Sequence, residues 1–196
     1  MEGVVAEGIA AAPAESAGDL ADRPYDLLAR ILHWLMAVLI VTMLFLGAAL
    51  VGTIGDYARL LNLHRTVGLA ILALAVVRIV NRLWRRAPAP GAGLPPAERA
   101  VAVGTEFALY ALFVAQPVVG WALVSASGIP VRVAGGIVLP AIAPENAALY
   151  AQLRTLHAWL AYLLLALFTA HMCGVLWHVA ARQDGLVRRM LWARRG

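Results

Sequence analysis

The sequence contains no lysine, only one cysteine, and few charged residues, which make up 14% of the chain. The single Cys173 excludes an internal disulfide framework and any motif that needs two cysteines, such as C-x-x-C-H haem attachment. With 62% hydrophobic residues, the chain is too apolar for an ordinary soluble domain. These shortages together indicate an integral membrane protein.

Four apolar stretches are long enough to cross a bilayer, which takes about 20 residues for a helix. They cover residues 31–51, 63–83, 107–131 and 156–181. We therefore predict an all-α fold, in which residues 23–196 form one integral membrane four-helix bundle with the lipid bilayer around it.

The arginines are distributed unevenly between the connections. Most of the 16 lie before the first stretch, around the second connection and in the C-terminal region. The positive-inside rule therefore places both termini in the cytoplasm and the first and third connections outside. This asymmetry accounts for the formal net charge of +5, so we infer no binding to nucleic acid.

Two segments outside the apolar stretches have a distinct composition. Residues 1–22 are rich in alanine, glycine and acidic side chains and lack the basic and apolar regions of a signal peptide, so we expect a flexible acidic tail. The third connection, about residues 125–152, carries apolar side chains. We expect part of it to lie on the outer membrane surface or to cap the bundle.

The histidines are the side chains most indicative of function, because ionisable residues at membrane depth are costly. His157 and His171 lie fourteen residues apart in the fourth stretch. In a helix, residues fourteen positions apart point in directions that differ by only about 40°, so the two side chains share a face. Their Cα atoms lie roughly 21 Å apart along the axis. The two side chains cannot bind one metal ion, so we predict two centres at different depths.

Each centre needs a partner from another helix at the same depth. His64 begins the second stretch at its outer end, level with His157, and His33 lies near the inner start of the first, level with His171. Two imidazoles from facing helices can bind one haem iron from opposite sides. We therefore predict two non-covalent haem b groups, with iron ligands paired as His33/His171 and His64/His157. Interhelical hydrogen bonding is the alternative role of a single such histidine.

Other polar residues near these depths have two interpretations each. His178, seven residues after His171, is predicted to contact a second ligand beside the inner haem, or simply to meet water. Arg78 is predicted to bind haem propionates or a quinone headgroup, the alternative being a side chain that extends to the interface. Arg65 and Arg154 flank the outer ligands and would attract small anions, or serve as surface anchors or propionate partners.

The sequence resembles the bacterial cytochrome b561 family, the four-helix di-haem proteins of the inner membrane, over about residues 24–192. The matching segments are "ILHWLM", "LHRTVGLAILALAVVRIVNRL", "YALFVAQPVVG", "LHAWLAYLLLALFTAHMCGVLWH" and "DGLVRRM". The resemblance implies that the four paired histidines are the haem b ligands and that ubiquinone exchanges electrons near the inner haem, where His178 matches a family histidine. One branch of the family is similar to a superoxide oxidase, and Arg154 falls where that branch has a basic residue.

We therefore expect a bacterial inner-membrane, multi-pass oxidoreductase that oxidises superoxide at the outer face and reduces ubiquinone near the inner haem. Inner groups such as His178 or Glu106 would supply protons. The alternative is a cytochrome b anchor subunit that links a peripheral dehydrogenase or hydrogenase to the quinone pool. A third possibility is a haem-free metal carrier or structural bundle.

Overall fold

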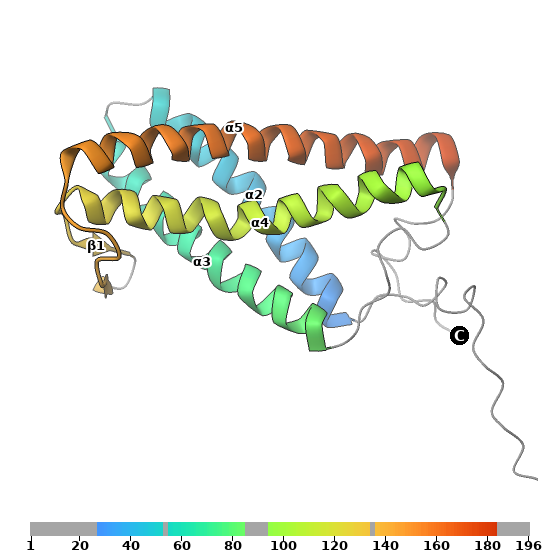
Figure 1. Cartoon of the computed structure of the whole chain (residues 1–196), viewed down its shortest axis with the longest axis horizontal. Coiled ribbons are helices and arrows are strands. Elements are labelled where there is room, and N and C mark those ends of the chain that lie inside the picture. Colours follow the sequence, from blue (N-terminus) through green and yellow to red (C-terminus); the bar gives the residue numbers. More distant parts are fainter. Residues whose placement is uncertain (1–26, 53–54, 85–93, 134–135, 184–196) are drawn as a thin grey trace, which may run out of the picture.

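The computed structural model describes residues 27–52, 55–84, 94–133 and 136–183, which are built almost entirely of long helices (Figure 1). The predicted tail, residues 1–22, lies outside the described residues. In chain order the elements are α2 (Leu27–Gly52), α3 (Tyr57–Trp84), α4 (Pro96–Ala126), β1 (Val131–Arg132), β2 (Val138–Leu139), α5 (Ala147–Trp177) and the short π-helix η2 (His178–Arg182).

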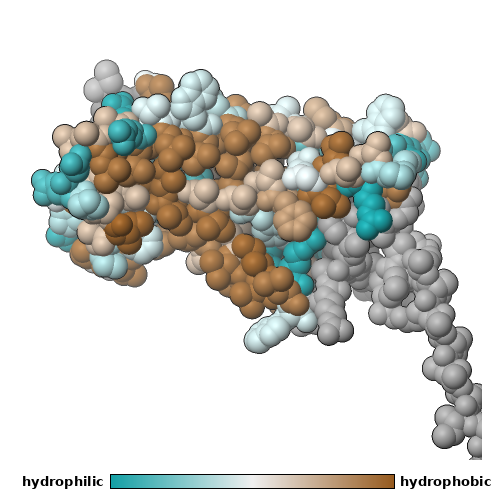
Figure 2. Space-filling view, in the orientation of Figure 1, coloured by the Kyte–Doolittle hydropathy of each residue, from teal (hydrophilic) through white to brown (hydrophobic). Residues whose placement is uncertain are grey.

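All four long helices are long and apolar enough to cross a membrane, as the sequence predicts. Figure 2 shows that hydrophobic side chains cover the middle of the bundle on the face in view, whereas hydrophilic ones gather towards its two ends. Few side chains are fully buried inside the protein, and on α5 only Leu164 is. The outward apolar faces are therefore suited to contact with lipid.

The helices pack as neighbouring pairs, α2 with α3, α3 with α4, and α4 with α5. One cluster of buried side chains lies around Met36 and Ile40 of α2 and Ile71 and Ala75 of α3. A second joins α4 to α5 and consists of Leu109, Leu112 and Leu164. The apolar faces of the helices thus meet along the bundle and bring the polar residues of different helices to common depths.

The predicted third stretch, residues 107–131, is wrong at its C-terminal end. Helix α4 ends at Ala126, and Val131 belongs to β1 instead. Gly128 has a φ of +74°, a conformation that ends a helix, and Pro130 follows two residues later. The helix also begins earlier than expected, at Pro96. Proline lacks a backbone N–H, but in the first turn of a helix this N–H would have no carbonyl acceptor within the helix, so proline is tolerated there.

The connection between α4 and α5 folds back over the end of these helices. β1 and β2 pair as a short antiparallel hairpin, Trp121 Nε1 donates to the Pro140 carbonyl at 2.9 Å, and Asn146 N donates to the Ala126 carbonyl at 3.1 Å. The Asn146 side chain then caps α5 by accepting from Leu149 N at 2.9 Å. We call this end of the bundle the hairpin end. The opposite end, which carries Arg78, Arg82 and Arg182, is the arginine end.

Candidate functional site

The histidine pair at the hairpin end joins α3 to α5. The rings of His64 and His157 face each other with centroids 6.2 Å apart and planes inclined at 72°. Two imidazoles that each bind the same metal ion through a nitrogen at about 2 Å would have centroids about 6 Å apart. The separation of these rings therefore fits a shared metal ion.

Helix α4, which carries no histidine, contributes two residues to this pair. Gln116 Nε2 donates to the His157 carbonyl oxygen at 3.0 Å and lies 3.4 Å from the ring Nε2. Gly120, one turn later, presents bare backbone to the ring, since a Cβ there would lie only 3.0 Å from His157 Cε1. The absence of a side chain at Gly120 leaves room for the imidazole, and Gln116 holds the backbone of α5 beside it.

Four buried polar atoms of the hairpin end have no hydrogen-bond partner in the described part of the chain. They are Nδ1 of His64, Nδ1 of His157, Oε1 of Gln116 and Nε of Arg65. Leaving a buried polar group without a partner costs about 1–3 kcal/mol. Several such atoms together indicate that a bound group belongs among these side chains.

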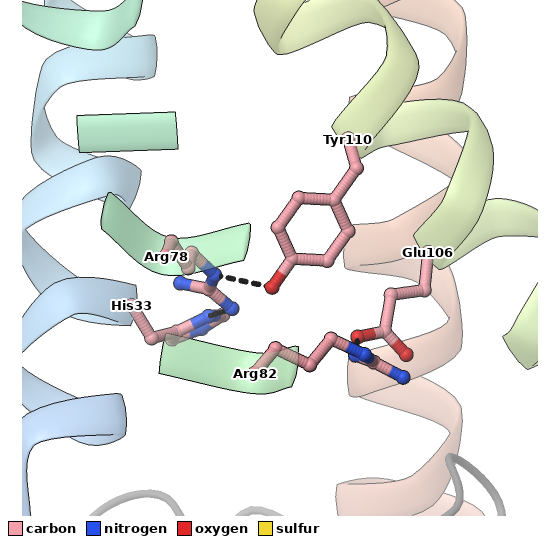
Figure 3. Close-up of polar contacts among 5 residues, drawn as sticks. All are labelled: His33, Arg78, Arg82, Glu106 and Tyr110. Atoms are coloured by element: carbon pink, nitrogen blue, oxygen red, sulfur yellow. Dashed lines mark hydrogen bonds and ion pairs between the residues drawn. The ribbon is translucent and has the colours of Figure 1, made fainter. Parts of the chain in front are cut away.

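The second pair, at the arginine end, is organised around Arg78 of α3 (Figure 3). Arg78 Nη2 lies 3.1 Å from His33 Nδ1, and Arg78 Nε donates to the Tyr110 hydroxyl at 2.7 Å. Arg78 also lies close enough to His171 to interact with it electrostatically, as His33 does. Residues from α2, α3, α4 and α5 thus converge on one point.

The contact between Arg78 and His33 defines the proton position on the imidazole. A guanidinium has only donors, so Nδ1 of His33 accepts the hydrogen bond and the ring proton lies on Nε2. A histidine that binds iron through Nε2 carries its proton on Nδ1 instead. Binding of iron at His33 Nε2 would therefore require Arg78 to leave this nitrogen for another acceptor.

Charged residues continue from this point towards the end of the bundle. Arg82 forms an ion pair with Glu106 and lies over the rings of Phe107 and Tyr110, at 5.9 and 5.8 Å from their centroids. Arg182 of η2 pairs with Glu98 of α4. The arginine end thus carries both cations and carboxylates.

His178 lies at the start of η2, one residue after α5 ends. Its side chain is half-buried, and the change from α-helical to π-helical winding at this point is of a kind that is frequent at functional sites. A contact between His178 and quinone stays a prediction.

The two arginines predicted beside the outer ligands take different positions. Arg65 is half-buried next to His64 and interacts with it electrostatically. Arg154 is exposed and lines a groove on α5 whose lining includes neither His64 nor His157. The structure thus brings Arg65, but not Arg154, to the histidine pair.

The donor set fits haem better than a metal ion held by protein alone. The described residues contain no group of three or more histidine, cysteine or acidic side chains that could hold a metal ion. Each centre offers two imidazoles, and a porphyrin supplies the remaining four nitrogens around iron. The ring separation at the hairpin end agrees with such a group, and Gly120 leaves room for the His157 ring that would help to hold it.

Two histidine pairs within a bundle of four helices that are long and apolar enough to cross a membrane are typical of membrane haem proteins of the electron-transfer class. The chain matches the family model for prokaryotic cytochrome b561 over residues 24–193. It is also 29% identical over 170 residues to "Cytochrome b561 homolog 2" of Escherichia coli (strain K12), a match that covers 85% of this chain and 90% of that protein. The chain therefore belongs to the prokaryotic cytochrome b561 family, whose members bind b-type haem, and is a membrane electron-transfer protein.

Proposed function

We propose that the protein carries electrons from superoxide at the hairpin end to ubiquinone at the arginine end, through two haem b groups. The observation that supports this proposal is the presence of two histidine pairs at two depths of one bundle. The ligands His157 and His171 of α5 are separated by roughly 21 Å along the helix, most of the thickness of a bilayer core. When bound, the haems supply one-electron carriers between the two ends.

At the hairpin end, the protein has to attract an anion and accept an electron from it, and no atom is transferred. Two superoxide anions each release one electron and leave as dioxygen. Arg65, half-buried beside His64, is the cation that is best positioned to attract them. His64 and His157 hold one haem between them, and Gln116 and Gly120 fit α4 against His157.

At the arginine end, the proposed acceptor requires protons as well as electrons. One ubiquinone takes up two electrons and two protons to form the quinol. His33 and His171 hold the second haem, Arg78 turns from His33 to a haem propionate or to the quinone, and His178 contacts the quinone from η2. The Glu106 carboxylate, paired with Arg82, is a group through which protons can reach this end.

The proposed orientation follows from the arginine distribution. The hairpin end faces outwards, the arginine end and both termini face the cytoplasm, and the membrane is the bacterial inner membrane. Superoxide formed outside the cell membrane would then deliver its electron to the quinone pool without entering the cytoplasm.

The test is stopped-flow spectroscopy on the purified full chain. A pulse of superoxide should reduce the haem on the time scale of the stopped-flow measurement, and ubiquinone added afterwards should reoxidise it. Arg65→Gln should slow the first step, with Arg132→Gln, an exposed arginine of the same end, as the matched control. No reduction by superoxide together with fast reduction by quinol would contradict the proposal. That result would favour an anchor subunit for a peripheral dehydrogenase or hydrogenase, and a colourless protein would favour a haem-free bundle.

A further inference from the structure

A groove that the histidine sites do not use runs along the first turns of α5. It has a volume of about 430 Å³, and its lining residues are Tyr150, Ala151, Arg154, Thr155, Ala158, Trp159 and Tyr162. All of them belong to α5, so no other described element covers the groove. It therefore opens sideways, towards the region that membrane lipid would occupy.

The depth of this groove in a bilayer follows from the length of the helix. Ala147–Arg182 is a continuous helical segment of 36 residues. Its midpoint falls beside Leu164, which also lies midway between His157 and His171. A hydrocarbon core of about 30 Å spans about 20 helical residues, or about ten on each side of Leu164. Arg154 is ten residues from Leu164, so its guanidinium lies at the depth of lipid phosphates.

Within the residues that the structure describes, no side chain compensates the charge of Arg154. Arg78, Arg82 and Arg182 each bond to a neighbouring side chain, whereas Arg154 has no hydrogen-bond or ion-pair partner in the part of the chain that the structure describes. No acidic side chain lines the groove. A guanidinium in this position can bind a phosphate group with two parallel hydrogen bonds.

The remaining lining fits the apolar part of the same ligand. Trp159 and Tyr162, both about two-thirds exposed, stand edge to face with centroids 6.1 Å apart, on the side of Arg154 nearer the middle of the bilayer. By the same measure both rings lie within the hydrocarbon core, where their apolar faces can pack against an acyl chain. The side chains of Ala151, Thr155 and Ala158 are short, so an acyl chain can lie close against the helix between the larger residues of the groove.

We propose that this groove binds one anionic phospholipid, with its headgroup phosphate on Arg154 and an acyl chain against Trp159 and Tyr162. An anionic lipid such as phosphatidylglycerol fits better than a zwitterionic one, because the lining has no carboxylate to pair with a positively charged headgroup. The proposal does not depend on the electron donor or acceptor, or on which side of the membrane the hairpin end faces.

The experiment is native mass spectrometry of the full haem-loaded chain in detergent, titrated with phosphatidylglycerol. Arg154→Gln should weaken the binding of the first lipid about tenfold, the effect expected when one hydrogen-bonded charge contact is lost. Arg132→Gln, which changes an exposed arginine of β1 at the same end, should leave it within twofold of the unchanged protein. Phosphatidylcholine, whose choline cation offsets the charge of its phosphate, should bind more weakly and lose less affinity in the Arg154→Gln variant.

Two further measurements separate this proposal from its alternatives. Trp159→Ala should also weaken phosphatidylglycerol binding while the haem content stays normal, and millimolar inorganic phosphate should not displace the lipid. Equal binding of phosphatidylglycerol to the Arg154→Gln variant would overturn the proposal, as would displacement by inorganic phosphate. A variant with unchanged lipid binding but slower reduction by superoxide would assign Arg154 to anion attraction instead.

Discussion

Both pairs consist of two histidines, but their surroundings differ. At the hairpin end, the ring centroids of His64 and His157 lie 6.2 Å apart, and within the described residues the buried Nδ1 of each ring has no hydrogen-bond partner. At the arginine end, Arg78 occupies Nδ1 of His33 and bonds to Tyr110. The Nδ1 atoms of the first site are therefore open to a partner, while Gln116 lies 3.4 Å from Nε2 of His157. At the second site, Arg78 has to leave Nδ1 of His33 before that ring can bind iron through Nε2.

This difference matches the two tasks that we propose. A site that only accepts an electron from a small anion needs a closely fitted haem edge and little mobile polar structure. A site that reduces quinone needs groups that can exchange hydrogen bonds and protons, and Arg78, Tyr110, Arg82 and Glu106 provide them. The comparison can be tested by variants that change one end and leave the other intact.

The largest effect is expected from removing one ligand of each pair. His64→Ala should abolish the haem at the hairpin end only, and His33→Ala the haem at the arginine end only, so that either variant retains half of the haem. Pyridine haemochrome analysis measures this content, with Cys173→Ser, an exposed position on α5, as the control. Full haem content in either histidine variant would show that the altered residue is not a ligand.

The next effect concerns the space at Gly120. A Cβ there would lie 3.0 Å from His157 Cε1, so Gly120→Ala should displace the ring and lower occupancy at the hairpin end. Gly104 lies in the same helix and has nothing within 4 Å of its added Cβ, so Gly104→Ala should leave haem content unchanged. Equal loss of haem from both variants would indicate a general effect on α4 rather than contact with His157.

A smaller effect is expected from Gln116→Leu. The change removes the donor to the His157 carbonyl oxygen but leaves both ligands, so both haems should remain bound. The reduction potential of one haem should shift by tens of mV, since a tenfold change in an equilibrium constant corresponds to about 59 mV for one electron. Spectroelectrochemical titration would resolve the two haems. An equal shift at both would contradict a contact confined to the hairpin end.

The smallest effect is expected from Tyr110→Phe at the arginine end. The variant loses one hydrogen bond to Arg78, worth about 0.5–1.5 kcal/mol, so quinone reduction should slow by about two- to tenfold. Reduction by superoxide at the other end should keep its rate. Stopped-flow traces of both steps provide the measurement, and a slower superoxide step would mean that the two ends are not independent.

The sequence predicted much of the fold and the proximity of His64 to His157. Both follow from local regularities: apolar runs of bilayer length, and a spacing of fourteen residues that repeats a helix face. The meeting of His64 with His157 follows from their equal depth. That these histidines bind haem stays a prediction, as do the roles of Arg78 and His178.

The parts that the sequence did not predict depend on contacts between helices. Gln116 and Gly120 lie in a helix without histidine, and nothing in their types shows that they meet His157. Their spacing of four residues, one helical turn, was the one available signal. The early end of α4 depended on Gly128 and the hairpin after it, and apolar residues beyond that glycine extended the predicted stretch too far.

Helix α5 is the only helix among those described that contributes a histidine to both pairs. In the proposed di-haem arrangement, the distance between the two centres is therefore determined by the rise of one rigid helix between His157 and His171, and not by how the other helices are arranged. Since the rate of electron tunnelling falls steeply with distance, a shift of α2 or α3 would alter the coordination of one centre but leave the tunnelling distance nearly constant. Sequence change in α2 and α3 is then less constrained by electron transfer than insertion or deletion within the fourteen-residue interval of α5.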